Sequence, residues 1–145
     1  MLNNNLYSKI ITKNDKKYIF DILRKKYILY TNEEKVRQHT IKYLMCKLKI
    51  PKSHISTEKE FKLENGLKKR FDIIAFNKIG KAAILVECKA SRIKISKKVI
   101  EQILIYNKKI KSKYLLVTNG IISIAFEVIN NEVKQINNMP SYSSL

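Results

Sequence analysis

The apolar residues of this chain recur with two spacings, of which one is typical of helices and the other of strands. Over residues 31–50 they return every three or four positions, so we predict a helix that buries the face containing Leu44. Thr31 and Glu34 match the capping-box pattern at its start, and a proline follows its expected end. The same spacing after Ser96 predicts a second helix through "KKVIEQILIYNKKIK".

Short apolar runs bounded by turn residues predict the strands. They lie at 54–63, 68–76, 82–90, 114–118, 121–129 and 132–136. Residues 18–31 alternate apolar and basic side chains, which leaves a strand pair and an extended lead-in as alternatives. We expect one domain over residues 18–140, a loose polar arm over 1–17 and a frayed tail over 141–145.

The order of these elements indicates the fold class. A helix is followed by three strands, a second helix, another strand and a closing hairpin. The connection from strand 82–90 through the second helix to strand 114–118 fits a right-handed βαβ crossover. We therefore predict an α/β domain with a central mixed β-sheet flanked by helices, antiparallel at first and parallel after the crossover.

Charged residues interrupt two of the predicted strands, at Asp72, Glu87 and Lys89. A core strand seldom carries a charge unless another group pairs with it. Because side chains alternate along a strand, Glu87 and Lys89 share one face, roughly 6–7 Å apart. If the loop between the strands is residues 78–81, Asp72 lies directly opposite Glu87. A loop that is one residue longer or shorter puts the two carboxylates on opposite faces.

Two facing carboxylates predict a site for a divalent cation. Like charges opposite each other destabilise a sheet, and a bound cation removes that conflict. Asp72, Glu87 and the backbone carbonyl of Cys88, together with waters, are ordinary ligands for Mg²⁺, for which Mn²⁺ is a substitute. Lys89 would then orient or deprotonate a water, or stabilise charge on a phosphoryl group. The alternative is an ion-pair cluster in which Lys89 bridges the two carboxylates without a metal.

An Asp on one strand followed by Glu-x-Lys on the next resembles the signature of the PD-(D/E)xK nuclease superfamily. The match here is Asp72 with "ECK" at 87–89, and Phe71 stands at the nominal proline. More narrowly, residues 18–140 resemble the N-terminal domain of the type I restriction enzyme R protein, through "EEKVRQHTIKYL", "LKKRFDIIAF" and "AILVECKA". The resemblance implies a restriction-endonuclease-like fold and a Mg²⁺-dependent nuclease that hydrolyses phosphodiester bonds, with DNA as the favoured substrate. A catalytically inactive nucleic-acid-binding or protein-interaction module that retains the fold is the alternative.

Other residues gain a role from the same resemblance. Gln102 and Tyr106 match a QxxxY motif that supports the nuclease site of the restriction subunits, which implies a catalytic role for both. A buried hydrogen bond between them in a core helix is the alternative. Glu34 is either the capping residue of the first helix or a further acidic metal ligand leaning over the site. Glu58 and Glu60 alternate with their neighbours and are expected on a solvated strand face.

The net charge of +18 indicates affinity for polyanions, of which nucleic acid is the usual one. A genome biased towards A and T is a competing explanation, because Lys, Asn and Ile are all frequent here. The residues expected to contact nucleic acid are Arg37, Arg70, Arg92, Lys94, Lys97 and Lys98. An ion pair with Asp72 or Glu87 is an equal alternative for Arg70, and a solvated basic loop is the alternative for residues 91–98.

The remaining features concern the cellular setting. Cys46 and Cys88 lie far apart with no CxxC pattern, which argues against zinc or a disulfide and indicates a reducing cytoplasm. No stretch approaches the roughly 20 apolar residues of a membrane span, and the first residues lack the apolar run of a signal peptide. We therefore expect a cytoplasmic protein that binds nucleic acid, and a homodimer and a larger restriction or repair assembly both stay open.

Overall fold

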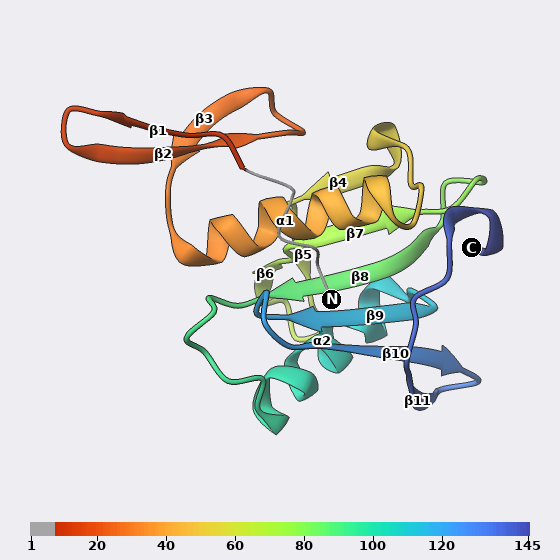
Figure 1. The fold of residues 1–145 in the computed structure, drawn as a ribbon. Coiled ribbons are helices and arrows are strands. Elements are labelled where there is room, and N and C mark those ends of the chain that lie inside the picture. The colour runs from red at the N-terminus through yellow and green to blue at the C-terminus, as the bar shows by residue number, and fades with distance from the viewer. Residues whose placement is uncertain (1–7) are drawn as a thin grey trace.

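The central sheet of this protein is mixed, as the sequence predicts. The computed structural model describes residues 8–145, and within them six strands form this sheet in the order β11-β10-β9-β8-β7-β4 (Figure 1). They are β4 (Ile55–Thr57), β7 (Ile73–Phe76), β8 (Ala82–Cys88), β9 (Tyr114–Thr118), β10 (Ser123–Ile129) and β11 (Glu132–Ile136). β8 and β9 are parallel and are connected through α2 (Lys97–Ile110), whereas the other neighbouring strands are antiparallel. The predicted α/β fold is confirmed.

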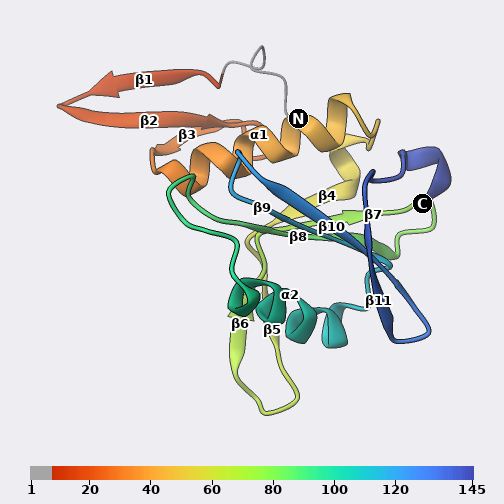
Figure 2. The ribbon, with the colours of Figure 1, turned by 60° about the horizontal axis from the view of Figure 1, so that its bottom comes forward.

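Helices α1 (Asn32–Cys46) and α2 cover opposite faces of the sheet (Figure 2). Under α1, residues such as Leu44 pack in one core cluster with Ile73 and Val86. Under α2, Ile103 belongs to a second cluster with Leu85. Because both faces of β8 are covered, its apolar run is nearly continuous, and a charge within it has to be paired locally.

The start of α1 follows half of the capping-box pattern. The hydroxyl of Thr31 accepts a hydrogen bond from the backbone N–H of Glu34 at 2.9 Å. The Glu34 side chain does not complete the box, because it bonds Arg37 and Gln38 instead. The helix ends at Cys46, before the expected position 50. Ser96 occupies the N-cap position of α2, but its side chain makes no capping hydrogen bond.

Two of the predicted strands are each divided in two. The segment 54–63 breaks at Glu58, whose φ is 51°, into β4 and β5 (Glu60–Lys62). The segment 68–76 breaks into β6 (Lys68–Arg70) and β7. β5 and β6 pair with each other and project as a separate hairpin on the α2 side of the sheet (Figure 2). The divided strands bring Glu58 and Asp72 together, since the Glu58 N–H bonds the Asp72 carbonyl at 3.1 Å.

The two ends of the described chain are more ordered than the sequence indicated. β1 (Ile10–Lys13), β2 (Lys16–Asp21) and β3 (Lys26–Leu29) form an antiparallel sheet of their own. The prediction of a loose arm is therefore wrong for residues 10–17, and residues 1–7 lie outside the described range. Near the C-terminus, Tyr142 donates its N–H to the Leu48 carbonyl at 2.7 Å and packs against the core, so the tail does not fray there.

Among residues 8–145, no helix has both the length and the apolar character that a membrane span requires.

Candidate active site

The register between β7 and β8, extended by one residue beyond its last pair, puts Asp72 opposite Glu87. Ile73 pairs with Val86, Ile74 with Leu85 and Ala75 with Ile84, which is the predicted register at this end of the strands. The loop differs from the prediction, because Asn77 bonds Lys81 and Phe76 pairs with Ala82. A β-bulge at Ala83 absorbs the one-residue difference. The register at the site is thus set by the bulge together with the loop, rather than by loop length alone.

Asp72 lies just before β7, and its side chain bonds residues of β8 and α1. Its Oδ2 accepts a hydrogen bond from the Cys88 backbone N–H at 2.7 Å, which fixes the carboxylate beside the end of β8. Its Oδ1 accepts a hydrogen bond from Arg37 of α1 at 2.9 Å. The side chain remains 14% exposed. The carboxylate is therefore held in a fixed orientation and still reaches solvent.

Glu87 is buried on the α2 face and is bonded by two neighbouring side chains. Its Oε1 lies 2.9 Å from Lys89 Nζ and accepts a hydrogen bond from Gln102 at 3.2 Å. The contact with Lys89 agrees with the expectation that both side chains share a face of the strand. Burial raises the pKa of Glu87 most, the Asp72 carboxylate raises it further, and Lys89 offsets only part of this, so that the pKa is about 7.

Gln102 and Tyr106 connect α2 to this carboxylate. The Gln102 side-chain amide donates to Glu87 and also lies 3.2 Å from the Tyr106 hydroxyl. The Tyr106 ring packs edge-on against Phe61 of β5, with 5.2 Å between ring centroids. The hydrogen bond between the two residues, which was the alternative to a catalytic role, is present, and Gln102 also bonds Glu87. This arrangement orients Glu87, because rotating its carboxylate would leave the amide unpaired.

Arg37 lies among several carboxylates of the site. Its side chain is 6% exposed and forms ion pairs with Glu34, with Glu58 at 3.1 Å and with Asp72 at 2.9 Å. Burial lowers the pKa of Arg37, but the surrounding carboxylates outweigh burial and raise it, so the guanidinium stays charged. Arg37 is therefore buried among carboxylates and does not lie on the surface with the other residues expected to contact nucleic acid. Glu34 forms an ion pair with Arg37, which in turn bonds Asp72, so Glu34 is connected to the site by Arg37. Burial raises the pKa of Glu34.

The position predicted for Glu58 from the sequence is wrong. It was expected on a solvated strand face, but its side chain is 15% exposed and forms ion pairs with Arg24, Arg37 and Arg70. Burial raises its pKa, but the arginines lower it by more. Arg70 therefore pairs with Glu58 rather than with Asp72 or Glu87. The left-handed break at Glu58 has no signature in the sequence, since glycine or asparagine is usual in that conformation.

The other residues expected to contact nucleic acid lie together on the surface. Arg92, Lys94, Lys97 and Lys98 are exposed in and after the connection from β8 to α2. This connection begins directly beyond Lys89, so these four cations follow the Glu-x-Lys segment in the sequence.

The donor groups at the end of β8 suit a divalent cation. Asp72 and Glu87 supply carboxylates, and the backbone carbonyl of Cys88, whose N–H bonds Asp72, is a further oxygen donor. A cation would relieve the repulsion that contributes to the raised pKa of Glu87. Among residues 8–145, no group of three or more His, Cys, Asp or Glu side chains is arranged to hold a metal. A cation here would therefore depend on the carbonyl and on water for its remaining ligands.

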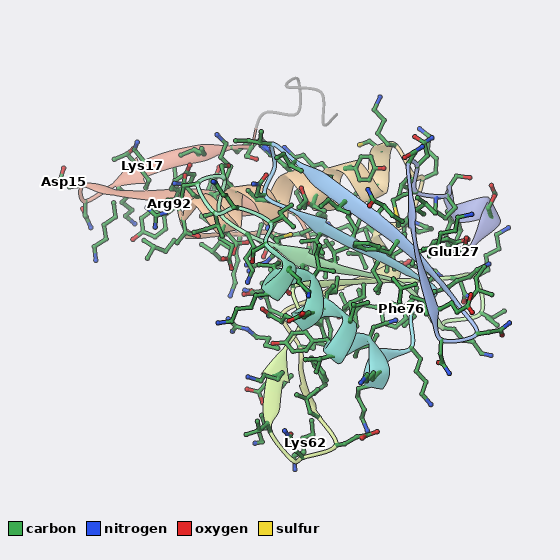
Figure 3. The ribbon with its side chains drawn as sticks, turned by 90° about the horizontal axis from the view of Figure 1, so that it is seen from below. Asp15, Lys17, Lys62, Phe76, Arg92 and Glu127 are labelled. Atoms are coloured by element: carbon green, nitrogen blue, oxygen red, sulfur yellow. The ribbon has the colours of Figure 1, made fainter. Side chains whose placement is uncertain are left out.

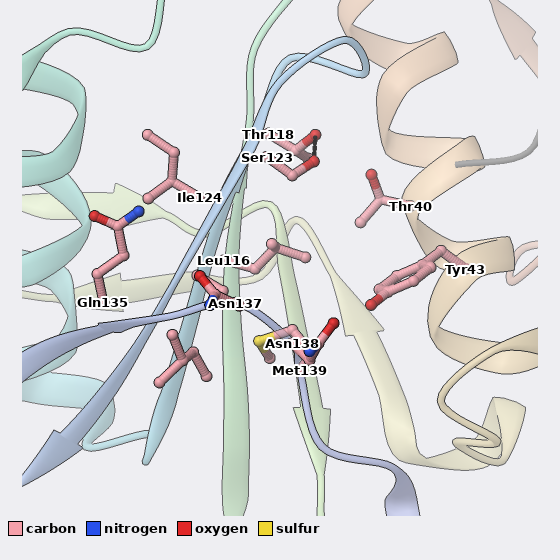
Figure 4. Close-up of a pocket in the computed structure, with 12 residues that line it drawn as sticks. Thr40, Tyr43, Leu116, Thr118, Ser123, Ile124, Gln135, Asn137, Asn138 and Met139 are labelled. Carbon is pink, nitrogen blue, oxygen red and sulfur yellow. Dashed lines mark hydrogen bonds between the residues drawn. The ribbon is translucent and has the colours of Figure 1, made fainter. Parts of the chain in front are cut away.

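A separate pocket of about 260 Å³ lies on the α1 face of the sheet (Figure 4). Thr40 and Tyr43 of α1 line it together with Thr118 and Ser123, whose hydroxyls are 2.8 Å apart. None of the described residues that line it is charged, and none belongs to the acidic site. The carboxylates thus lie outside this pocket.

The fold and site together define a class: a mixed-sheet α/β domain with an Asp just before one strand and Glu-x-Lys at the end of the neighbouring strand. Residues 32–140 match the family model described as the type I restriction enzyme R protein N terminus. The chain therefore belongs to that family.

A solved structure has the same fold. It is described as a "putative nuclease belonging to DUF820" from Anabaena variabilis, with a TM-score of 0.51 and 10% sequence identity. The match covers 93% of this chain and 88% of the other chain. At this identity the likeness concerns the fold alone. A search of curated proteins returned no match.

Proposed function

We propose that this protein is a Mg²⁺-dependent nuclease that hydrolyses phosphodiester bonds in DNA. The observation that carries the proposal is the position of the Asp72 carboxylate at the end of β8, where it accepts a hydrogen bond from the Cys88 N–H at 2.7 Å, with Lys89 bonded to the neighbouring Glu87 at 2.9 Å. Membership of the restriction-enzyme family supports it. A cation bound by the two carboxylates would polarise the phosphate and activate a water.

Each side chain then has a separate task. Asp72 and Glu87 would hold the cation, and the hydrogen bonds from Cys88 and Gln102 would keep the two carboxylates in place. Burial lowers the pKa of Lys89, but its hydrogen bond and ion pair with Glu87 outweigh burial and raise it. Lys89 is thus a protonated donor at neutral pH. We assign it to stabilising charge on the phosphate oxygens rather than to removing a proton from water.

A plasmid-cleavage assay tests this proposal. Supercoiled plasmid and single-stranded DNA are incubated with the protein in Mg²⁺, in Mn²⁺ and in EDTA. We expect cutting in either metal, none in EDTA, and none with Asp72→Ala or Lys89→Ala. Lys111→Ala, which removes an exposed lysine at the far end of α2, is the matched control and should cut normally.

The proposal fails if folded wild-type protein cuts no DNA with either metal, or if cutting survives Lys89→Ala. Binding without cutting would instead identify a catalytically inactive nucleic-acid-binding module.

A further inference from the structure

The pocket on the α1 face of the sheet has an uncharged lining, although charged residues make up 29% of the chain (Figure 4). At that frequency, several of its 12 lining residues would carry a charge. The charged side chains Lys17, Lys62 and Arg92 lie instead on β2, on β5 and in the connection before α2 (Figure 3). The lining therefore suits a ligand without net charge, because a buried charge needs a partner of opposite sign.

The floor of the pocket is apolar and is formed by three neighbouring strands. Leu116 of β9 pairs with Ala125 of β10, and Ala125 pairs in turn with Ile136 of β11. Leu116 and Ala125 are buried, and all three side chains belong to the core cluster under α1 or pack against it. Met139 also lines the pocket, and its thioether makes favourable contacts with aromatic rings. The face of a planar ring would pack well on this floor.

The walls of the pocket supply groups that both donate and accept hydrogen bonds. The hydroxyls of Thr118 and Ser123 lie 2.8 Å apart at one end. The Tyr43 hydroxyl and the Asn138 amide extend from opposite sides toward the middle of the pocket (Figure 4). Within residues 8–145, neither of these two side chains makes a hydrogen bond. An amide presents donors and an acceptor side by side, as the polar edge of a nucleobase does.

The size of the pocket restricts the ligand further. Its volume of about 260 Å³ corresponds to about nine waters, at about 30 Å³ for each water of the liquid. A single purine or pyrimidine base has this size, whereas a drug-sized ligand needs about 300–1,000 Å³. Ser123 and Asn138 are exposed, whereas Leu116 and Thr118 are buried, so the polar groups extend from the inner end to the mouth. A sugar attached to the base would extend into solvent.

We infer that this pocket binds one neutral purine or pyrimidine base, with a face of its ring on Leu116 and Ala125 and its polar edge on Tyr43 and Asn138. A free base and the base of a nucleoside share this chemistry. The inference goes beyond the proposed function and does not depend on it, since none of the lining residues belongs to the acidic site.

Isothermal titration calorimetry tests the inference with five ligands: adenine, uracil, uridine, orotate and ribose. Orotate is uracil with an added carboxylate, so it tests the preference for a neutral ring. Ribose is neutral and polar but has no flat ring, so it tests the role of the apolar floor.

Three variants alter the pocket itself. Tyr43→Phe and Asn138→Ala each remove one polar group, and Ala125→Leu fills the space above the floor. Tyr27→Phe is the matched control, because it removes a hydroxyl from an exposed ring outside the pocket. Circular dichroism verifies that every variant is folded, and Asn138 is exposed, so its replacement leaves the core intact.

We expect adenine or uracil to bind with a dissociation constant below about 1 mM. Orotate and ribose should bind at least about tenfold more weakly than uracil. Tyr43→Phe and Asn138→Ala should each weaken binding of the base about 3–10-fold, because each variant loses one hydrogen bond. Ala125→Leu should abolish binding, and Tyr27→Phe should leave it unchanged. Uridine that binds as tightly as uracil would identify a nucleoside as the ligand, and weaker binding would identify the free base.

The inference is overturned if neither base binds to the folded wild-type protein in this range. Orotate or ribose that binds as tightly as uracil would also overturn it. Bases that bind equally well to the wild-type protein and to the three pocket variants would place the binding elsewhere on the molecule.

Discussion

Arg37 on α1 donates a hydrogen bond to the Asp72 carboxylate at 2.9 Å, and this contact connects the helix to the candidate active site. The same guanidinium pairs with Glu34 and with Glu58. The site is therefore built around a buried cation supplied by the protein. Its geometry depends on a residue from outside the Asp…Glu-x-Lys motif.

Replacing Arg37 by methionine should destabilise the fold strongly. The substitution leaves Asp72, Glu34 and Glu58 without their shared partner, and removing one member of a buried ion pair costs about 3–5 kcal/mol. We expect a loss of that size in the free energy of unfolding, measured by urea denaturation at pH 7. Arg92→Met removes an exposed arginine and should change the free energy of unfolding by less than about 0.5 kcal/mol. A loss below about 1 kcal/mol for Arg37→Met would show that the cluster contributes little to stability.

The raised pKa of Glu87 predicts a pH dependence of stability in the metal-free protein. With a pKa of about 7 in the folded state and an ordinary value of 4.5, the folded protein binds more protons between these limits than the unfolded chain does. The contribution of Glu87 to the free energy of unfolding is therefore greatest at low pH and falls as the pH rises through about 7.

Glu87→Gln isolates this effect. In EDTA, the stability of the variant relative to wild type should increase from pH 5 to pH 8, by up to about 3 kcal/mol. Urea denaturation at several pH values provides the measurement, with the exposed Glu101→Gln as a control that should show no such trend. A relative stability that stays constant, or that decreases with pH, would show that Glu87 is not held at a raised pKa.

Gln102 acts as a positioning residue in this account. Gln102→Leu keeps the size of the side chain and removes the hydrogen bond to Glu87, so we expect cleavage to slow about 10–100-fold, as is typical when a residue behind a metal ligand is lost. Metal affinity should weaken together with the rate, which a purely structural role would not require.

Single-turnover cleavage and Mn²⁺ titration provide the two readouts for Gln102. Tyr106→Phe should have a smaller effect, because the amide of Gln102 still reaches Glu87. If Gln102→Leu left both the rate and the metal affinity unchanged, the link from α2 to Glu87 would have no functional role.

The alternation of side chains predicted much of the site, because it depends on local geometry. It was sufficient to place Glu87 and Lys89 on one face, whereas the position of Asp72 opposite Glu87 also required the assumption that the loop is residues 78–81. The bulge at Ala83 was not predictable, because it compensates for a shorter loop and leaves the pairing at the site unchanged. The register was therefore correct at the site although the loop length was wrong.

Contacts between distant segments explain what the sequence did not reveal. Glu58 is 34 residues from Arg24 and 21 residues from Arg37, and nothing local distinguishes it from the exposed Glu60. β1 was missed for a different reason: all of its residues are exposed, so it lacks the apolar alternation by which a half-buried strand is recognised.

Titration with Mn²⁺, followed by electron paramagnetic resonance, tests the central claim most directly, because it measures whether Asp72 and Glu87 hold a cation together. We predict that the wild-type protein binds Mn²⁺ at this site, that Asp72→Ala and Glu87→Ala each abolish the binding, and that Lys89→Ala retains it while losing cleavage. Binding that is equally strong in folded Asp72→Ala, or no binding by the wild-type protein, would contradict the account.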